Sequence, residues 1–365
     1  MAPAGACACI RRVSGAAGES SPVVERVASG LVVCLIAGLL SFAATWLVRR
    51  HAPRLGLVQA PNARSSHSVP TPGGGGLGIV LGGAVASLYA VPSAPVPVLT
   101  ALVASLVLAA VGFRDDRAPL HPGLRLLAQA GLWLLAILAT GALTPLAAGA
   151  GIPAPLLLAG LALVGVYWIN LFNFMDGIDG LAGSQAVFML LGAAVLALLG
   201  GAIGPDAPLL WWLAGIAAAT LGFLVLNWPP ATIFMGDVGS TWLGFVLAVL
   251  ALLTMSWGWL SLWQWLILGA AFMTDASVTL ARRLLRGERV LEAHRRHAYQ
   301  ALARRWRSHR RVTLLFIAID VAWLLPLAVW AAGAGWVAAA LAYVPLVALA
   351  LAAGAGAPEQ AERAR

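Results

Sequence analysis

The chain has 365 residues, of which 61% are hydrophobic and only 10% are charged. A soluble domain of this length needs a far more charged surface, so the composition excludes a soluble globular protein. The formal net charge is +9, and the basic residues other than histidine are all arginine. Because no nucleic-acid-binding motif accompanies this charge, we expect the arginines to meet anionic lipid, and we expect no nucleic-acid partner.

Apolar stretches of about 20 residues, the length that crosses a bilayer, recur along the whole chain. They predict an all-α polytopic membrane protein with about eleven transmembrane helices. To within several residues, the expected spans are 30–48, 74–91, 97–113, 124–140, 155–172, 181–199, 209–226, 242–257, 262–280, 312–332 and 336–353. Residues 1–29 are expected to form a disordered tail, residues 30–354 the transmembrane domain and residues 355–365 a cytoplasmic tail. Residues 142–153 fit either a re-entrant piece or a simple loop.

The loops between the expected spans alternate in charge. Every second loop carries arginines, aspartates or histidines, whereas the intervening loops are short and almost uncharged. With an odd number of spans, the positive-inside rule places the N-terminus outside, the C-terminus in the cytoplasm and the charged loops on the cytoplasmic side. A carboxylate at mid-membrane costs about 2.5–3.5 kcal/mol. Acids gathered at one face therefore indicate an interfacial enzyme more than a transporter. A transport path would place ionisable groups in the middle of the membrane.

Two polar segments lie in the first third of the chain. The glycine run 73–76 enters a span, where its backbone N–H groups can cradle an anion, and a flexible turn is an equally good interpretation. Asp115 and Asp116 follow at the cytoplasmic end of the next span, flanked by arginines. Adjacent carboxylates point in different directions on a helix, so one can face a metal while the other contacts an acceptor. A solvated salt-bridge cluster is the alternative.

The central segment repeats polar side chains every three residues: Asn170, Asn173, Asp176 and Asp179. Steps of three stay on one broad face of a helix, so two amides and two carboxylates can be presented together. The apolar helix expected from residue 181 would direct its N-terminal amides at a bound phosphate. The alternative is an N-capped helix start with incidental acids, but two like charges this close need a cation or a donor.

Two further segments follow in the second half. Asp237 sits between glycines with a hydroxyl three residues on, which suits a carboxylate that holds a divalent ion beside phosphate oxygens, and Phe234 offers a flat face to a nucleobase. A Pro-rich turn is the alternative. His294 and His297, among arginines, can grip a diphosphate, whereas zinc would need a further ligand. An ordinary basic loop is the alternative there.

Together, these segments offer several carboxylates and no evident Ser or Cys nucleophile. Oxygen ligands that hold an ion jointly with substrate phosphates indicate Mg²⁺, with Mn²⁺ as the second choice. Phosphoryl transfer needs mainly positioning and charge neutralisation, which such an ion and arginines supply. An acceptor dissolved in the bilayer would explain why the site is built on many spans.

The motifs and their order resemble the polyprenyl-phosphate N-acetylhexosamine-1-phosphate transferase family. They read D-D, N-x-x-N-F-M-D-G-I-D-G-L, N-x-P-x-x-x-x-F-M-G-D-x-G-S and H-R-x-H-A-Y-Q, within residues 64–300. The resemblance implies a UDP-N-acetyl amino sugar as donor, undecaprenyl phosphate as acceptor, Mg²⁺ as cofactor and release of UMP. It also implies a site on the cytoplasmic face of the bacterial inner membrane. The sequence leaves a homodimer open.

The resemblance also implies roles for individual residues. The expected Mg²⁺ ligand is Asp237, and the pair linked to the metal and to activation of the lipid phosphate is Asp115 and Asp116. The central nucleotide and phosphate site is expected to comprise Asn173, Asp176 and Asp179. Asn227 and Phe234 would hold the uridine, with His294 and His297 near the diphosphate.

Two departures from the family pattern bear on the donor. The peptidoglycan enzymes of the family carry a Lys shortly after the Asp pair, where this chain runs Arg117-Ala118-Pro119-Leu120. They also have adjacent histidines where this chain has His-Arg-Arg-His. Both departures argue against a muramoyl-pentapeptide donor and favour a branch that initiates O-antigen or another surface glycan.

Two other functions remain as alternatives. A secondary transporter needs ionisable groups at the midplane, for which Asp275 and Asp320 are the candidates. A CDP-alcohol phosphotransferase expects Ala-Arg after its first Asp-Gly, whereas Asp176-Gly177 is followed here by Ile178.

Overall fold

The computed structural model describes residues 22–59, 70–288 and 294–358. The helices are α1 (Pro22–Leu55), α2 (Gly76–Ala90), α3 (Pro95–Arg117), α4 (Pro122–Ala139), α5 (Leu143–Ala150), α6 (Ala154–Phe174), α7 (Leu181–Leu199), α8 (Pro208–Asn227), α9 (Asp237–Ser256), α10 (Leu262–Leu268), α11 (Ala270–Leu284), α12 (Ala298–Trp306), α13 (His309–Ile319) and α14 (Leu325–Ala353). A 3-10 turn at Val91–Ser93, a π-helical segment η2 at Asp320–Leu324 and the antiparallel pair β1 (Val58–Gln59) and β2 (Thr71–Pro72) complete the described elements. The all-α fold class is confirmed.

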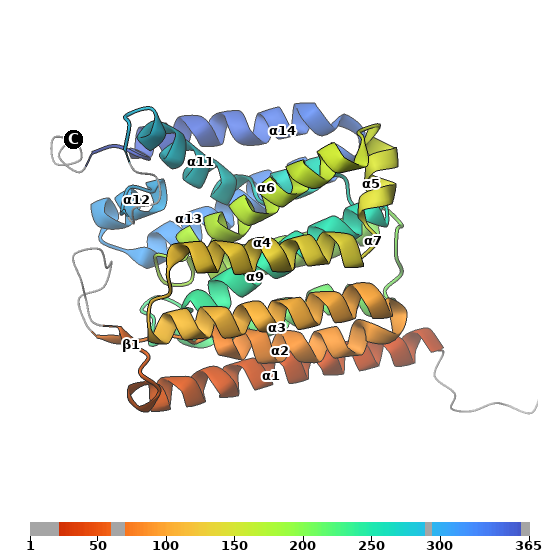
Figure 1. Ribbon diagram of the computed structural model, residues 1–365, viewed down its shortest axis with the longest axis horizontal. Helices are drawn as coiled ribbons and strands as arrows, with labels where there is room; N and C mark the ends of the chain where they lie inside the picture. Colours follow the sequence, from red (N-terminus) through yellow and green to blue (C-terminus); the bar gives the residue numbers. More distant parts are fainter. Residues whose placement is uncertain (1–21, 60–69, 289–293, 359–365) are drawn as a thin grey trace, which may run out of the picture.

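The long helices lie side by side along one direction, with α1 at one edge and α14 at the other (Figure 1). Several of them, including α3, α4, α6 and α8, start with proline in the first two positions, where the missing N–H costs no hydrogen bond. In the most apolar window of α9, 83% of the residues are buried, against 22% in α1, α4 and α6. We therefore place α9 in the interior and the other three at the periphery.

The peripheral helices direct leucines outward. On α6, Leu163 is 75% exposed and Leu156 is 66% exposed. A soluble protein would place charged side chains at such positions, whereas hydrocarbon chains are a suitable environment for leucine. Within the described ranges, nine helices are long and apolar enough to cross a membrane. The chain is therefore a multi-pass membrane protein.

Each of the eleven expected apolar stretches is helical, but three differ in detail from the expectation. The expected span 262–280 is broken at Gly269 into α10 and α11. The last two expected spans form one helical run, His309–Ala353, interrupted at Ala334, which has φ −139° and ψ 44°. The number of bilayer crossings stays a prediction.

The run His309–Ala353 must turn back on itself. A straight helix of 45 residues would extend about 68 Å at 1.5 Å per residue. Both ends nevertheless lie beside α12: His309 follows α12 directly, and the N–H of Gly356 donates to the carbonyl of Arg296, just before α12, at 2.7 Å. The chain therefore reverses near Ala334, where the sequence predicts the loop between two spans.

The ends of the described chain lie at opposite ends of the bundle, because α1 starts at one end and α14 finishes at the other (Figure 1). The first helix begins earlier than expected. Residues 22–29, expected to belong to a disordered tail, are helical. Pro22 at the first position and Glu25 in the first turn favour a helix start there. The remaining expected tail, residues 1–21, and the end of the chain from residue 359 lie outside the described residues.

Candidate functional site

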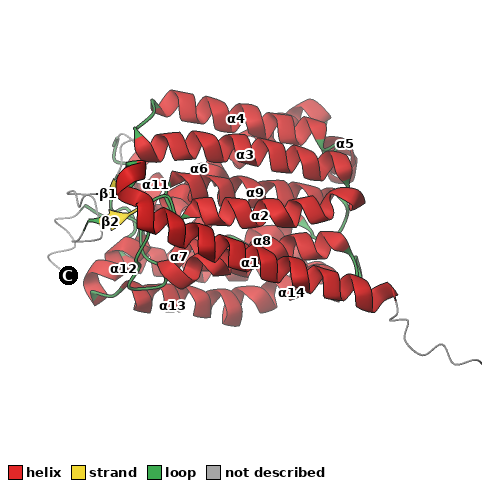
Figure 2. Ribbon diagram, turned by 90° about the horizontal axis from the view of Figure 1, so that it is seen from below, coloured by secondary structure: helices red, strands yellow, loops and turns green. Residues whose placement is uncertain are grey.

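The predicted site residues come together at one end of the bundle. The C-terminal ends of α3, α6 and α8 and the N-terminal ends of α4, α7 and α9 meet there. Figure 2 shows β1, β2 and α12 at this same end. The short connections between these helices therefore bring side chains from distant parts of the sequence into contact.

Asp116, from the last turn of α3, caps the first turn of α9. Its two carboxylate oxygens accept hydrogen bonds from the backbone N–H groups of Asp237, at 2.8 Å, and Val238, at 3.0 Å. These N–H groups have no partner within the helix, and the positive end of the helix dipole favours an anion at this position. Gly236 allows the approach: its φ is +77°, and a Cβ there would lie 2.6 Å from an Asp116 oxygen.

Arg125, from α4, links two of the predicted acids. Its Nη1 donates to Asp115 Oδ2 at 2.6 Å and to Asp237 Oδ2 at 3.0 Å. The other oxygen of Asp115 accepts from the N–H of Leu120 at 2.6 Å. The ion pairs therefore involve Arg125 and not the arginines that flank the Asp pair, and the Asp115 side chain is only 10% exposed, so the arrangement is not the solvated cluster given as the alternative.

Asn173, at the end of α6, reaches the other side of Asp237. Its Nδ2 donates to Asp237 Oδ1 at 2.9 Å and also lies 2.8 Å from Ser240 Oγ. Asn170, one turn earlier, instead donates to Gln129 on α4 at 2.6 Å. Residues from α3, α4, α6 and α9 thus form one connected network around Asp237.

Asp176 lies in the loop between α6 and α7, outside the membrane-spanning helices. Burial, together with the nearby charges of Asp237, Asp116 and Asp179, raises the pKa of Asp176 to about 8. Like charges disfavour ionisation unless a cation compensates them. Several carboxylates therefore lie close together here, of which Arg125 bonds two, and this is the electrostatic setting of a cation or phosphate site.

Asn227 joins two loops of the site. Its Oδ1 accepts from the N–H of Gly180 at 3.0 Å, its Nδ2 donates to the carbonyl of Ile233 at 2.9 Å, and the residue is only 4% exposed. Because the side chain is buried, a direct contact with uridine, as the family resemblance implies, would require the surrounding loops to move. Phe234 is half-buried, and its backbone pairs with Pro72 and Gly75.

The glycine run does not provide a free anion cradle. The N–H groups of Gly73, Gly75 and Gly76 already donate to the carbonyls of Leu57, Phe234 and Met235. A Cβ at Gly76 would lie 2.2 Å from the Cα of Gly239. The glycines therefore serve close packing of α2 against the start of α9, and the anion-binding interpretation is wrong for these three amides.

The two predicted histidines stack on each other, with ring centroids 4.9 Å apart. His297 is 4% exposed, and its Nδ1 lies 3.3 Å from Asp275 Oδ1. Burial, together with the charges of His297, Arg283 and Arg296, lowers the pKa of His294 to about 3. His294 is therefore a neutral ring at physiological pH, able to accept or donate a hydrogen bond but not to supply charge to a diphosphate.

Asp275, a candidate for a transport pathway, instead caps α12. Its carboxylate accepts from the N–H groups of Ala298, at 2.8 Å, and Tyr299, at 2.9 Å. Tyr299 in turn donates to the carbonyl of Phe174 at 2.9 Å. Asp275 thus fixes α12 against the end of α6, close to the central segment.

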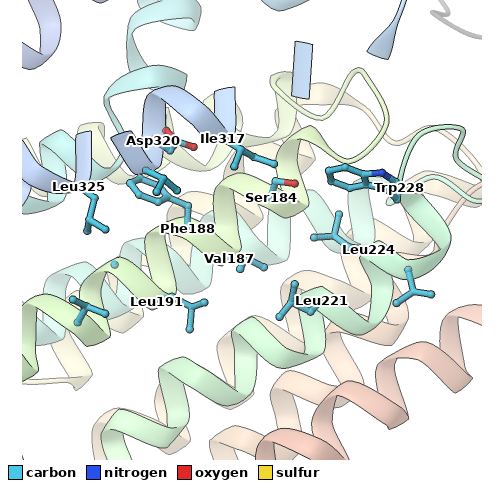
Figure 3. Close-up of a pocket in the computed structure, with 14 residues that line it drawn as sticks. Ser184, Val187, Phe188, Leu191, Leu221, Leu224, Trp228, Ile317, Asp320 and Leu325 are labelled. Atoms are coloured by element: carbon cyan, nitrogen blue, oxygen red, sulfur yellow. The ribbon is translucent and has the colours of Figure 1, made fainter. Parts of the chain in front are cut away.

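Asp320, the second transport candidate, faces an apolar pocket of about 550 Å³ between α7, α8 and η2 (Figure 3). Phe188, Leu221 and Trp228 also line this pocket. Asp320 is 1% exposed, and its Oδ1 has no hydrogen-bond partner among the described residues. A transport pathway needs several ionisable groups around a wet cavity, so this apolar pocket favours a packing site over a pathway.

A second, polar pocket of about 750 Å³ lies beside the acids. We call it the arginine pocket; its walls include Asp179, Pro229, Gln300, Arg307, His309 and Arg310. It lies between the central segment, the loop after α8 and the α12–α13 connection. A cavity of this size can accept part of a nucleotide sugar.

Three residues of this region have no place in the predicted site: Arg125, Asp275 and His309. Arg125 contacts Asp237 across 112 positions of the sequence, and His309 contacts Asp179 across 130 positions. Partners this far apart in the sequence form no local motif from which their contact could be predicted. For Arg125 and His309, the available signal is their position in loops assigned to the same side of the membrane, whereas Asp275 lies within the expected span 262–280.

The residues fit a divalent cation that is held partly by substrate. Among the described residues, no group of three or more His, Cys, Asp or Glu side chains is arranged to hold a metal ion. Mg²⁺ usually binds one or two carboxylates together with substrate phosphates, so a smaller protein donor set suits it. Asp237 and Asp176 offer oxygen ligands of that kind. The oxygens of Asp237 accept from two side chains, those of Asn173 and Arg125, which can move aside more easily than the two backbone amides bonded to Asp116.

Comparison with known proteins places the chain among related enzymes. The glycosyl transferase family 4 pattern matches residues 98–255. The chain is 31% identical over 298 residues to a Bacillus subtilis protein named "Probable undecaprenyl-phosphate N-acetylglucosaminyl 1-phosphate transferase". The aligned region covers 79% of this chain and 82% of the relative. It is 32% identical over 323 residues to a decaprenyl-phosphate N-acetylglucosaminephosphotransferase of Mycobacterium tuberculosis, 78% of each chain. It is 34% identical over 261 residues to a phospho-N-acetylmuramoyl-pentapeptide-transferase of Synechococcus sp., 66% of this chain and 70% of the relative.

Proposed function

The chain belongs to the polyprenyl-phosphate hexosamine-1-phosphate transferase family, and we propose that it transfers an N-acetyl amino sugar-1-phosphate from a UDP-sugar to undecaprenyl phosphate. The observation that carries this proposal is the network of Asp116, Asn173 and Asp237 at one end of a membrane bundle. A lipid phosphate and a water-soluble nucleotide can meet only at such a boundary. We place this end at the cytoplasmic face of the bacterial inner membrane, following the distribution of arginine.

The reaction needs little covalent chemistry from the protein. An oxygen of the lipid phosphate attacks the β-phosphorus of the donor, which carries the sugar. The new P–O bond forms as the bond from that phosphorus to the bridging oxygen breaks, and UMP leaves with the electron pair. The protein's task is to hold two anionic substrates in line and to neutralise their charge.

Mg²⁺ would supply the larger part of that neutralisation, with Mn²⁺ as the substitute. Asp237 and Asp176 are the residues that would hold it, together with phosphate oxygens. Arg125 keeps Asp115 and Asp237 together and adds a positive charge beside them. Asn173 orients Asp237 from the other side. The charges of Asp237, Asp116 and Asp179 beside Asp176 support this assignment, because a cation would relieve the repulsion among the carboxylates.

The donor's sugar and the pathway are further parts of the proposal. The His-Arg-Arg-His sequence and the absence of a Lys in residues 117–120 favour an enzyme that initiates O-antigen or a similar surface glycan. Two of the relatives carry N-acetylglucosamine in their names, so UDP-N-acetylglucosamine is the first donor to test.

The direct test is release of UMP by the purified protein in detergent with Mg²⁺, undecaprenyl phosphate and each of several UDP-N-acetyl amino sugars. We expect UMP with at least one donor, and its absence with all of them contradicts the proposal. Asp237→Asn should abolish turnover, because it removes a charge from the centre of the network. The matched control is Asp206→Asn, whose carboxylate pairs with Arg26 outside the network at 3.5 Å. CMP release from a CDP-alcohol donor would support the phosphotransferase alternative instead.

A further inference from the structure

Asp179 is held from three directions, by His309 and Thr313 of α13 and by the chain at Ala231. His309 Nδ1 lies 3.2 Å from Asp179 Oδ1 and accepts from the backbone N–H of Asp179 at 3.5 Å, and Thr313 Oγ1 donates to the carbonyl of Asp179 at 2.9 Å. The other carboxylate oxygen accepts from the N–H of Ala231 at 3.1 Å. Because the backbone and both carboxylate oxygens are engaged, the orientation of this side chain is set by residues outside its own segment.

His309 is itself well fixed. It is the first residue of α13, and the side chain of Ser308 caps that helix by accepting from the N–H of Arg311 at 3.2 Å. The His309 side chain is 21% exposed and that of Asp179 is 13% exposed. A contact between two largely buried groups is screened less by water than a surface pair, so it can hold a defined geometry.

Both residues line the arginine pocket. Arg307 and Arg310 line it too, and neither pairs with a carboxylate among the described residues. The carboxylate of Asp179 therefore stands in a wall that is otherwise basic. If a nucleotide sugar enters this pocket, the carboxylate can accept from its hydroxyl and N–H groups only if it is kept turned toward them and away from the phosphates.

We propose that His309, together with Thr313, is a positioning residue that fixes Asp179 in the wall of the donor pocket. This inference rests on the proposed function, because it takes the bound molecule to be the UDP-sugar. It extends the site to α13, beyond the motifs recognised in the sequence and beyond residues 98–255 of the family match. His309 acts through Asp179; the residue that contacts the donor is Asp179.

The test compares three variants in the UMP-release assay. His309→Ala should raise the KM for the donor or lower kcat/KM by about 10- to 100-fold, as expected for loss of a group that orients a ligand-binding side chain, with the KM for the lipid unchanged. His309→Asn should recover most of the activity, because its amide lies where the ring Nδ1 lies. Thr313→Val should shift the same parameter in the same direction. The matched control is His51→Ala, since His51 Nδ1 contacts the carbonyl of Leu47 in its own helix and His51 does not line the arginine pocket.

A double-mutant cycle separates positioning from general stability. If His309 acts through Asp179, adding His309→Ala to Asp179→Ala should cost no further activity. Three outcomes would each overturn the proposal. The first is additive losses in the cycle, and the second is an unchanged donor KM and kcat in His309→Ala. The third is equal losses in His309→Ala and His309→Asn together with a lowered melting temperature.

A measurement of nucleotide binding tests the role of His309 without requiring turnover. Binding of the UDP-sugar to the detergent-solubilised protein can be measured by calorimetry without lipid. Wild-type protein that releases no UMP refutes the proposed function. The same binding measurement still decides the role of His309, because His309→Ala should weaken binding of the UDP-sugar and His309→Asn should restore it.

Discussion

Gly236 holds a conformation that other residues adopt only under strain. Its φ is +77°, and a Cβ at this position would lie 2.6 Å from an Asp116 oxygen, so an alanine would both strain the backbone and displace the carboxylate. Gly236→Ala should therefore lower the melting temperature, by a stability loss of about 1–3 kcal/mol, and abolish most UMP release. Gly258 also has a positive φ, of +72°, but nothing lies within 4 Å of its Cβ position.

Gly258→Ala is therefore the matched control for backbone strain alone. It should cost about 1–2 kcal/mol and leave turnover intact. Thermal unfolding in detergent and the UMP assay distinguish the two variants. Equal activity in both would mean that the contact between Gly236 and Asp116 has no bearing on the site.

At the scale of single residues, the sequence predicts the acids but not their partners. Asp116, Asp176 and Asp237 stand in short motifs whose spacing already indicates phosphate chemistry, and the structure brings them together. Their chemical roles stay predictions. Arg125 and His309 could not be predicted, because each acts on a residue more than 100 positions away and their own neighbours carry no motif.

Ion pairs and buried hydrogen bonds together hold the connection between α11 and α12 and the start of α12. Glu288 pairs with Arg283 at 3.1 Å and with Arg296 at 2.6 Å, and these arginines lower the pKa of Glu288. Asp275 caps α12 at its first amides. His294, between them, is kept neutral by its surroundings.

This neutral histidine predicts a pH dependence of stability. The pKa of His294 is about 3 in the folded protein, below the ordinary value of 6.5, so the unfolded chain takes up a proton first as pH falls. Its contribution to stability is thus present above about pH 6.5 and is lost progressively between that pH and about 3. The melting temperature should fall from pH 7.5 to pH 5, and His294→Gln should reduce that fall. An equal fall in the variant would contradict the prediction; His51→Gln is the matched control.

At the scale of elements, hydropathy predicts where the helices lie but not how each one is broken. The reversal near Ala334 coincides with a loop expected between spans, because glycines flank it on both sides. The break at Gly269 gave no such signal, since the apolar residues continue through it. Hydropathy also does not predict the start of α1 at Pro22, because Glu25, Arg26 and Ser29 interrupt the apolar residues before the continuous stretch begins.

For the whole molecule, the alternation of charged and uncharged loops predicts an orientation that can be measured. Gly204 and Pro358 are exposed and belong to connections at opposite ends of the bundle. In a variant whose three cysteines are replaced by serine, a membrane-impermeant thiol reagent should label Gly204→Cys in intact cells. It should label Pro358→Cys only after the membrane is opened. The reverse pattern would invert the proposed orientation and move the acids to the outer face.

The cap that Asp116 provides has a practical consequence. One side chain belongs both to the cluster of acids and to the hydrogen bonds that begin α9, the innermost helix. Any ligand that redistributes charge around this carboxylate must also tighten or loosen the first turn of that helix. Heat denaturation should therefore report occupancy directly, so that candidate donors and ions can be ranked by melting curves before a turnover assay for them exists.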